Sequence, residues 1–167
     1  MINEHFERLK ECLEDQQRVY QALLDLVIQE KDLLIHADIA ELDKSNKHKE
    51  ALVGKAKGLD RVREVRVDEL LASLQIPPQK IRLTELAQHF SGKEAELLLA
   101  YQKSLTLVLE RLKEVNVQNE KLTQSAKKAI DGVISVLKGQ LPENKVYKKK
   151  GSLQKNTHPG SIVSKEV

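Results

Sequence analysis

The chain has 167 residues, a length that suits one domain, and it is 32% charged and 40% hydrophobic. Aromatic residues make up only 3% and tryptophan is absent, which disfavours a β-sandwich or barrel and favours Leu-rich helical packing. The single cysteine, Cys12, has no partner for an internal disulfide. No apolar run approaches the roughly 20 residues that span a bilayer, and the acidic N-terminus lacks the apolar segment of a signal peptide. We therefore expect an all-α, cytoplasmic protein without stable membrane insertion.

Positive charge is concentrated at the C-terminus. Residues 142–167 hold six lysines against two glutamates, a net charge of +4, so residues 1–141 carry −1 of the total of +3. The segment has too few large apolar residues to offset the entropy cost of ordering it. We predict a helical domain over residues 1–141 and a disordered, Lys-rich tail over 142–167. The lysines indicate a solubilising tail or contact with nucleic acid or acidic membranes; because no interleaved aromatic residues support base stacking, we expect no nucleic acid partner.

The first 36 residues carry one long apolar seam. Apolar residues recur at alternating steps of three and four over four heptads, with Gln16 and Glu30 as polar interruptions. The pattern weakens near His36, after which Asp38 and Glu41 resemble the start of a new helix. We predict a long amphipathic helix that is followed by a kink or a tight turn.

A second, less regular helical pattern covers about residues 39–74. Gly54 and Gly58 lie inside it and each costs about 1 kcal/mol relative to alanine, so they mark a weak or bent turn or a close contact between helices. Pro77 and Pro78 end this helix, because neither can donate a backbone hydrogen bond and the first ring restricts the residue before it. Residues 79–90 are expected to form a short helix or a connector.

The most regular seam lies in the third segment and keeps the 3-4 step for more than five heptads. It consists of Leu98, Tyr101, Leu105, Val108, Leu112, Val115, Asn119, Leu122, Ala126, Ala129, Val133 and Val136. We predict a helix over about residues 92–138, stopped by Gly139 and Pro142, with a length of about 70 Å. Because no other segment is so long, we expect an elongated antiparallel bundle of three main helices with a protruding C-terminal helix end.

Asn119 occupies a seam position of this helix, where a leucine would pack better. A buried amide at such a position fixes register and partner choice at a cost in stability, because a misregistered partner leaves the amide unpaired. Asn116 lies on the flank of the same face. The two amides either contact an adjoining helix or lie partly exposed on a solvated helix.

Beyond Asn119, apolar side chains cover more of the helix than one seam requires: Ala126, Ala129, Ile130, Val133, Ile134, Val136 and Leu137. So wide an apolar surface suits either recognition of a partner helix or closure of the intramolecular bundle. The spacing identifies the face but does not separate these two interpretations.

Signals for catalysis, metal binding and cofactors are nearly absent. The five histidines are scattered, and none forms an i, i+4 pair with a companion acid. Cys12 lies beside the first seam without a CxxC partner, which favours a packing role over a nucleophile. No phosphate-loop, dinucleotide or nucleophile-elbow motif occurs. We expect neither an enzyme nor a cofactor nor a metal site.

Together these segments resemble the FlgN family of flagellar export chaperones over about residues 6–151. The resemblance rests on LLDLVIQEKDLL with the Ala-Asp-Ile-Ala-Glu-Leu turn, on the lysine-containing KHKEALVGKAKGLDRVR, on LLASLQI and on the Asn-x-x-Asn pair of NVQNEKL before a hydrophobic helix end. Tyr147 and Gly151 in the tail also correspond. The many lysines of the tail and the extension past Gly151 depart from the family pattern.

The resemblance implies a cytoplasmic chaperone that binds hook-filament junction (hook-associated) proteins and prevents their premature assembly. Such a chaperone delivers its clients to the flagellar type III export gate and the export ATPase complex. Within this expectation, client binding involves Asn119 as a register marker and the apolar residues Ala126, Ala129, Ile130, Val133, Ile134 and Leu137. Tyr147 is a candidate for docking on the export machinery. The alternative is a structural or adaptor coiled-coil protein that self-associates.

Overall fold

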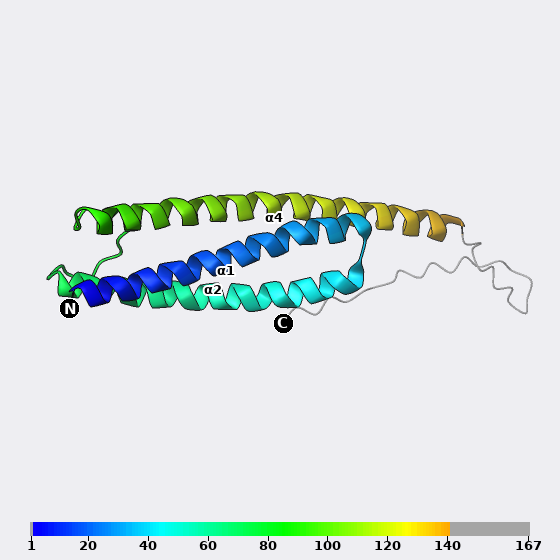
Figure 1. Cartoon of the computed structure of the whole chain (residues 1–167). Coiled ribbons are helices and arrows are strands. Elements are labelled where there is room, and N and C mark those ends of the chain that lie inside the picture. Colours follow the sequence, from blue (N-terminus) through cyan, green and yellow to red (C-terminus); the bar gives the residue numbers. More distant parts are fainter. Residues whose placement is uncertain (1, 141–167) are drawn as a thin grey trace, which may run out of the picture. The chain divides into compact units, whose positions relative to one another are not determined.

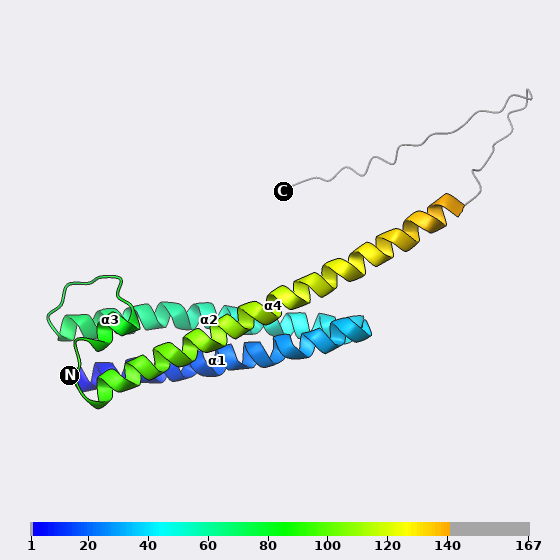
Figure 2. The same cartoon turned by 90° about the horizontal axis from the view of Figure 1, so that it is seen from above.

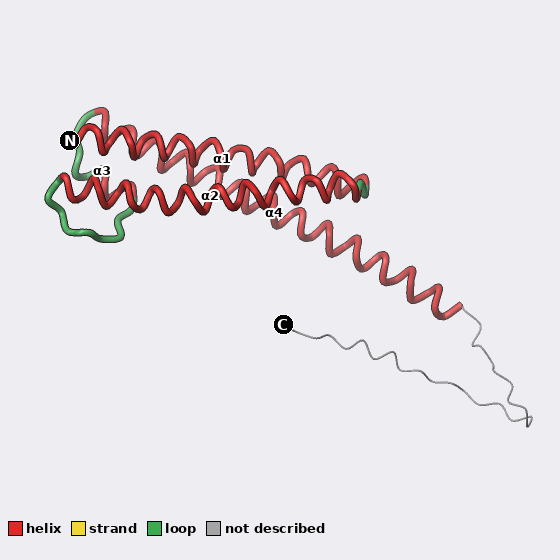
Figure 3. Tube along the Cα trace, turned by 90° about the horizontal axis from the view of Figure 1, so that it is seen from below, coloured by secondary structure: helices red, strands yellow, loops and turns green. Residues whose placement is uncertain are grey.

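The protein is described here from a computed structural model, which describes residues 2–140. This part of the chain is helical almost throughout and contains no strand (Figure 3). Its helices are α1 (Ile2–His36), α2 (Ile39–Ser73), α3 (Leu83–Ala87) and α4 (Lys93–Gln140). The prediction of an all-α fold is confirmed. The predicted tail, its boundary at residue 142 and Tyr147 lie outside the described residues.

The described chain divides into two units, which meet at Ala126 and Lys127 within α4. In the first unit, α1, α2 and the first part of α4 form an elongated bundle, with α3 at one end (Figure 1). α2 runs antiparallel to α1, whereas α4 runs parallel to it (Figure 2). Of the second unit the structure describes the remainder of α4. The last helix is the longest, as predicted, with 48 residues against 35 in each of α1 and α2.

The turn between α1 and α2 follows its sequence signals. Ala37 has a φ of 53°, a left-handed conformation that ends α1. Asp38 then caps α2, because its side chain accepts a hydrogen bond from the backbone N–H of Glu41 at 3.1 Å. The predicted tight turn is confirmed.

The boundaries of α4 lie within two residues of those predicted from the sequence. Gly92, with a φ of 63°, immediately precedes the helix, in a conformation that favours glycine. At the other end α4 extends to Gln140, within two residues of the predicted end at 138; it passes Gly139, and the predicted stop at Pro142 lies outside the described residues. A single glycine costs a helix only about 1 kcal/mol, which does not by itself end it.

The core of the bundle changes its composition along α1. At the N-terminal end of α1 all four helices contribute, through Phe6, Leu9, Leu13, Val67, Leu70, Leu71, Leu86, Ala87, Leu98 and Leu105. The middle cluster joins Val19 and Leu23 to Ala56 of α2. Towards the α1–α2 turn, the buried cluster contains only α1 and α4 residues: Leu24, Val27 and Val115. α1 is therefore the central helix, and α4 is its main apolar neighbour near the turn.

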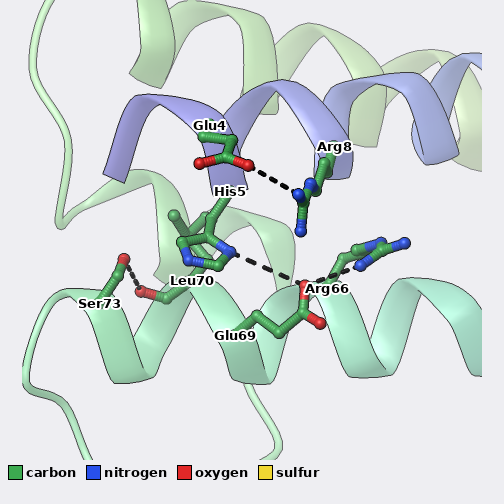
Figure 4. Close-up of polar contacts among 7 residues, drawn as sticks. All are labelled: Glu4, His5, Arg8, Arg66, Glu69, Leu70 and Ser73. Carbon is green, nitrogen blue, oxygen red and sulfur yellow. Dashed lines mark hydrogen bonds and ion pairs between the residues drawn. The ribbon is translucent and has the colours of Figure 1, made fainter. Parts of the chain in front are cut away.

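A polar contact joins the N-terminal end of α1 to the C-terminal end of α2 (Figure 4). His5 Nδ1 lies 3.8 Å from Glu69 Oε2, and Arg66 Nη1 donates to the same oxygen at 2.8 Å. The hydrogen bond from Arg66 lowers the pKa of Glu69. Because these side chains are partly exposed, we expect the contact to orient the two helix ends rather than to stabilise them strongly.

Gly54 and Gly58 lie in an unbroken α2, and a Cβ atom at either position would meet no heavy atom within 4 Å. Neither glycine is therefore needed for a close helix contact in the described structure. Gly54→Ala and Gly58→Ala should each raise the free energy of unfolding by about 1 kcal/mol, because alanine loses less backbone entropy in a helix. Urea denaturation measures the change.

Gly92→Ala is the matched comparison, because its φ of 63° strains an alanine although the space beside it is equally open. This variant should be destabilised by about 1 kcal/mol. Destabilisation by the α2 substitutions would show that the outer face of this helix is packed against something in solution.

Candidate functional site

α1 and α4 are joined side by side by a row of polar contacts with a constant sequence offset. Each contact joins residues 87 positions apart: Glu14 with Tyr101 at 2.8 Å, Gln17 with Ser104 at 2.8 Å, and Lys31 with Gln118 at 3.4 Å. Constant offset over this length means that the two helices are parallel and keep one register. At the same offset the last residue of α1, His36, is level with Thr123.

Asn119 lies at the end of this helix pair and is only 5% exposed. Its Nδ2 donates a hydrogen bond to the backbone carbonyl oxygen of Val27 at 2.9 Å. Its Oδ1 is buried without a hydrogen-bond partner, beside the Leu24, Val27 and Val115 cluster. The predicted seam position is therefore a buried contact between α1 and α4. Asn116 is exposed and makes no such contact.

Asn119→Asp should lower the free energy of unfolding by about 2 kcal/mol or more at neutral pH, because it buries a charge that faces a carbonyl oxygen. Asn119→Leu should change stability by less than about 1 kcal/mol, since it removes the hydrogen bond and the unpaired oxygen together. Urea denaturation of both variants gives the comparison. Equal stability of the Asp variant and the natural chain would contradict the burial of this residue.

Tyr101 anchors the other end of the polar row. Burial, together with the hydrogen bond that its hydroxyl donates to Glu14, raises the pKa of Tyr101 to about 12. The unfolded chain should ionise this tyrosine near pH 10, so the folded state favours its neutral form. The stability that this preference provides is complete below about pH 10 and is lost as the pH rises towards about 12.

Tyr101→Phe should abolish that alkaline loss of stability. The pH dependence of the urea midpoint measures it, and the phenolate absorbance of the folded protein reports the titration directly. Tyr20→Phe is the comparison: burial raises the pKa of Tyr20 as well, so this variant should lose a separate part of the alkaline effect, through a hydroxyl that contacts Asp60 on α2. An unchanged alkaline profile in the Tyr101 variant would contradict a buried, bonded hydroxyl at this position.

From Thr123 to Gly139 every side chain of α4 is exposed. The large aliphatic ones are Ile130 at 59%, Val133 at 60%, Ile134 at 42%, Val136 at 58% and Leu137 at 56%. With 3.6 residues per turn these side chains, Ala126 and Ala129 fall within roughly 160° of the helix circumference. We call this surface the apolar face of α4. It continues the seam that Leu98, Leu105 and Val115 bury in the bundle.

The sequence-predicted residues therefore separate into two groups. Asn119 is buried between α1 and α4, whereas Ala126, Ala129, Ile130, Val133, Ile134 and Leu137 all lie on the exposed apolar face. Val136, which belongs to the same face, was not among the predicted contact residues. The 3-4 spacing that Val136 shares with Val133 and Ala129 is the signal that identifies it.

The rest of the described chain offers no candidate catalytic or metal-binding site. Cys12 is buried, burial raises the pKa of its thiol, and its sulfur lies 3.6 Å from the carbonyl oxygen of Leu59. Among residues 2–140, no three His, Cys, Asp or Glu side chains gather as a metal site. No helix in this range is both long and apolar enough to cross a bilayer.

Comparison with known proteins agrees with the sequence resemblance. The sequence model of the FlgN family, described as FlgN protein, matches residues 1–155. The chain belongs to the FlgN family. Searches among curated proteins and among solved structures gave no match. Membership in FlgN assigns the chain in general terms to the flagellar export chaperones, a family of binding proteins rather than of enzymes.

Proposed function

We propose that this FlgN protein is a cytoplasmic chaperone of hook-filament junction proteins. It binds these clients before export, prevents their premature assembly and delivers them to the flagellar type III export gate. The observation that carries the proposal is the exposed apolar face of α4, with client contact at Ala126, Ala129, Ile130, Val133, Ile134 and Leu137. Asn119 enters as the residue that marks the register of α4 on α1.

The exposure of this face supports binding rather than bundle closure. An aliphatic side chain gains roughly 1 kcal/mol when a half-exposed surface is buried, so covering five of them yields about 5 kcal/mol. Ordering a client segment that is disordered when free offsets part of this gain. The balance suits a complex that forms before export and dissociates at the gate.

Docking on the export gate and its ATPase complex is assigned, in this proposal, to Tyr147.

The competing function is a structural or adaptor coiled coil, in which the apolar face of α4 pairs with another copy. A parallel measurement of sedimentation over a range of protein concentrations separates the two. A chaperone forms a complex with its client in a ratio of 1:1, whereas a coiled coil associates with itself.

Ile130→Asp and Val133→Asp should each weaken binding of a purified junction protein from the same organism by about 2 kcal/mol, or roughly 30-fold. The reason is that a client helix would bury an unpaired carboxylate. Isothermal titration calorimetry measures the affinity, and circular dichroism of the free variants measures their helical content. The helical content should stay nearly unchanged, because both positions are exposed.

Val65→Asp provides the matched control on α2, since Val65 is 54% exposed and Val133 is 60% exposed. This variant should bind as the natural chain does. If the two α4 variants instead lost helical content, the face would be part of the folded core in solution. If all three variants bound equally well, the client site would lie elsewhere.

A further inference from the structure

The two ends of α4 differ in charge. Residues 93–120 contain four basic and five acidic side chains, a net charge of −1. Residues 121–139 contain four lysines against one aspartate, a net charge of +3. The helix is therefore basic only where its apolar face is exposed, and a partner that covers this face meets positive charge.

Two of these lysines border the apolar face. Lys127 and Lys138 are 11 residues apart, which places them about 20° apart around the helix and roughly 16 Å apart along it. Ile134 lies on the same line, so the lysines form one edge of the face; Asp131 lies between them. Both lysines are exposed, and neither pairs with a carboxylate of residues 2–140.

The other two lysines, Lys121 and Lys128, lie on the opposite side of α4, seven residues apart. The remaining edge of the apolar face carries no charge and is built from Ser125, Ala129 and Val136, with Gly132 and Gly139 between it and the side that carries Lys121 and Lys128. A helix that lies along the face therefore meets charge on one side only. This asymmetry selects both the chemistry and the orientation of the partner.

We propose that the segment bound by α4 is an amphipathic helix with Asp or Glu along one edge of its own apolar face. Two of these acids, spaced about three turns apart, pair with Lys127 and Lys138. The inference rests on the proposed function, because it specifies the client segment of that same site. Opposite charge at the rim favours correct partners and places the client helix in one register. A client helix whose edge is basic would be repelled by the two lysines.

A second copy of the chain does not supply this partner. In an antiparallel pair of α4 ends, Lys127 of one copy faces Lys138 of the other at two places, and the single Asp131 of each copy offsets only part of this repulsion. In a parallel pair, the lysine edge faces the uncharged edge and gains no ion pair. Only a partner with an acidic edge satisfies both lysines while it covers the aliphatic side chains.

The test compares two double variants of the full-length chain that change its charge by the same amount. Lys127→Glu with Lys138→Glu reverses the edge, and Lys121→Glu with Lys128→Glu reverses the opposite side. Each is titrated with the purified junction protein at low and at high salt. The edge variant should bind about tenfold more weakly at low salt, and most of this difference should disappear at about 1 M salt. The opposite-side variant should bind nearly as the natural chain does.

The outcomes separate the two proposals. If both double variants bound the junction protein equally weakly, the effect would come from net charge alone, and the edge pairing would be overturned. Normal binding by both variants would also overturn it, while a loss of binding in Val133→Asp would leave the proposed function intact. If the lysine variants and the aspartate variants all bound normally, both the edge pairing and the proposed function would be overturned. Anionic phospholipid vesicles serve as a further probe, and binding to them as tight as to the junction protein would assign the basic edge to a lipid surface.

Discussion

The hydrogen bond from Asn119 to the Val27 carbonyl sets the register on which the rest of the bundle depends. Around it, α1 and α4 meet through aliphatic side chains, whose burial is favourable but not directional. A shift of α4 along α1 keeps much of that burial, but it leaves the amide buried against an aliphatic neighbour at a cost of about 1–3 kcal/mol. This buried bond, together with the more exposed polar row from Glu14–Tyr101 to Lys31–Gln118, thus selects among several otherwise acceptable packings. It also decides which α4 residues lie level with the end of α1.

The second buried amide of the bundle lies on α1 and contacts α2. Gln16 is 2% exposed and donates through Nε2 to Asp60 of α2 at 2.6 Å, and the Tyr20 hydroxyl reaches the same carboxylate. A partly buried carboxylate needs such donors, because its desolvation is otherwise costly. α1 therefore contacts α2 and α4 through two separate sets of polar contacts, and each set includes one buried amide. This arrangement explains why a residue that interrupts the apolar pattern is among the most deeply buried.

The periodicity of the sequence was enough to predict the helices and the inward sides of α1 and α4, because side-chain direction follows from 3.6 residues per turn. It did not predict what covers that side. Val115 and Val133 occupy equivalent seam positions of one helix, yet they are 3% and 60% exposed, because burial depends on the reach of α1 and α2. In α2, Ile39 and Val62 fit the helical spacing but are 72% and 41% exposed. The candidate site was therefore predictable as a face, and the separation of Asn119 from that face required the structure.

An exposed apolar face can function in partner binding only if it avoids self-association and discriminates among partners. Reducing its apolar area would weaken every partner equally and would not discriminate among them. Charge placed at one edge leaves the aliphatic area unchanged and adds repulsion between copies in an antiparallel pair. It strengthens the binding only of partners with acids at the matching positions. In the proposed complex the affinity then has an apolar part, which salt affects little, and an ionic part, which salt or a competing charged surface weakens. A client held in this way is released by a change at the rim, without unfolding of the bundle that positions it.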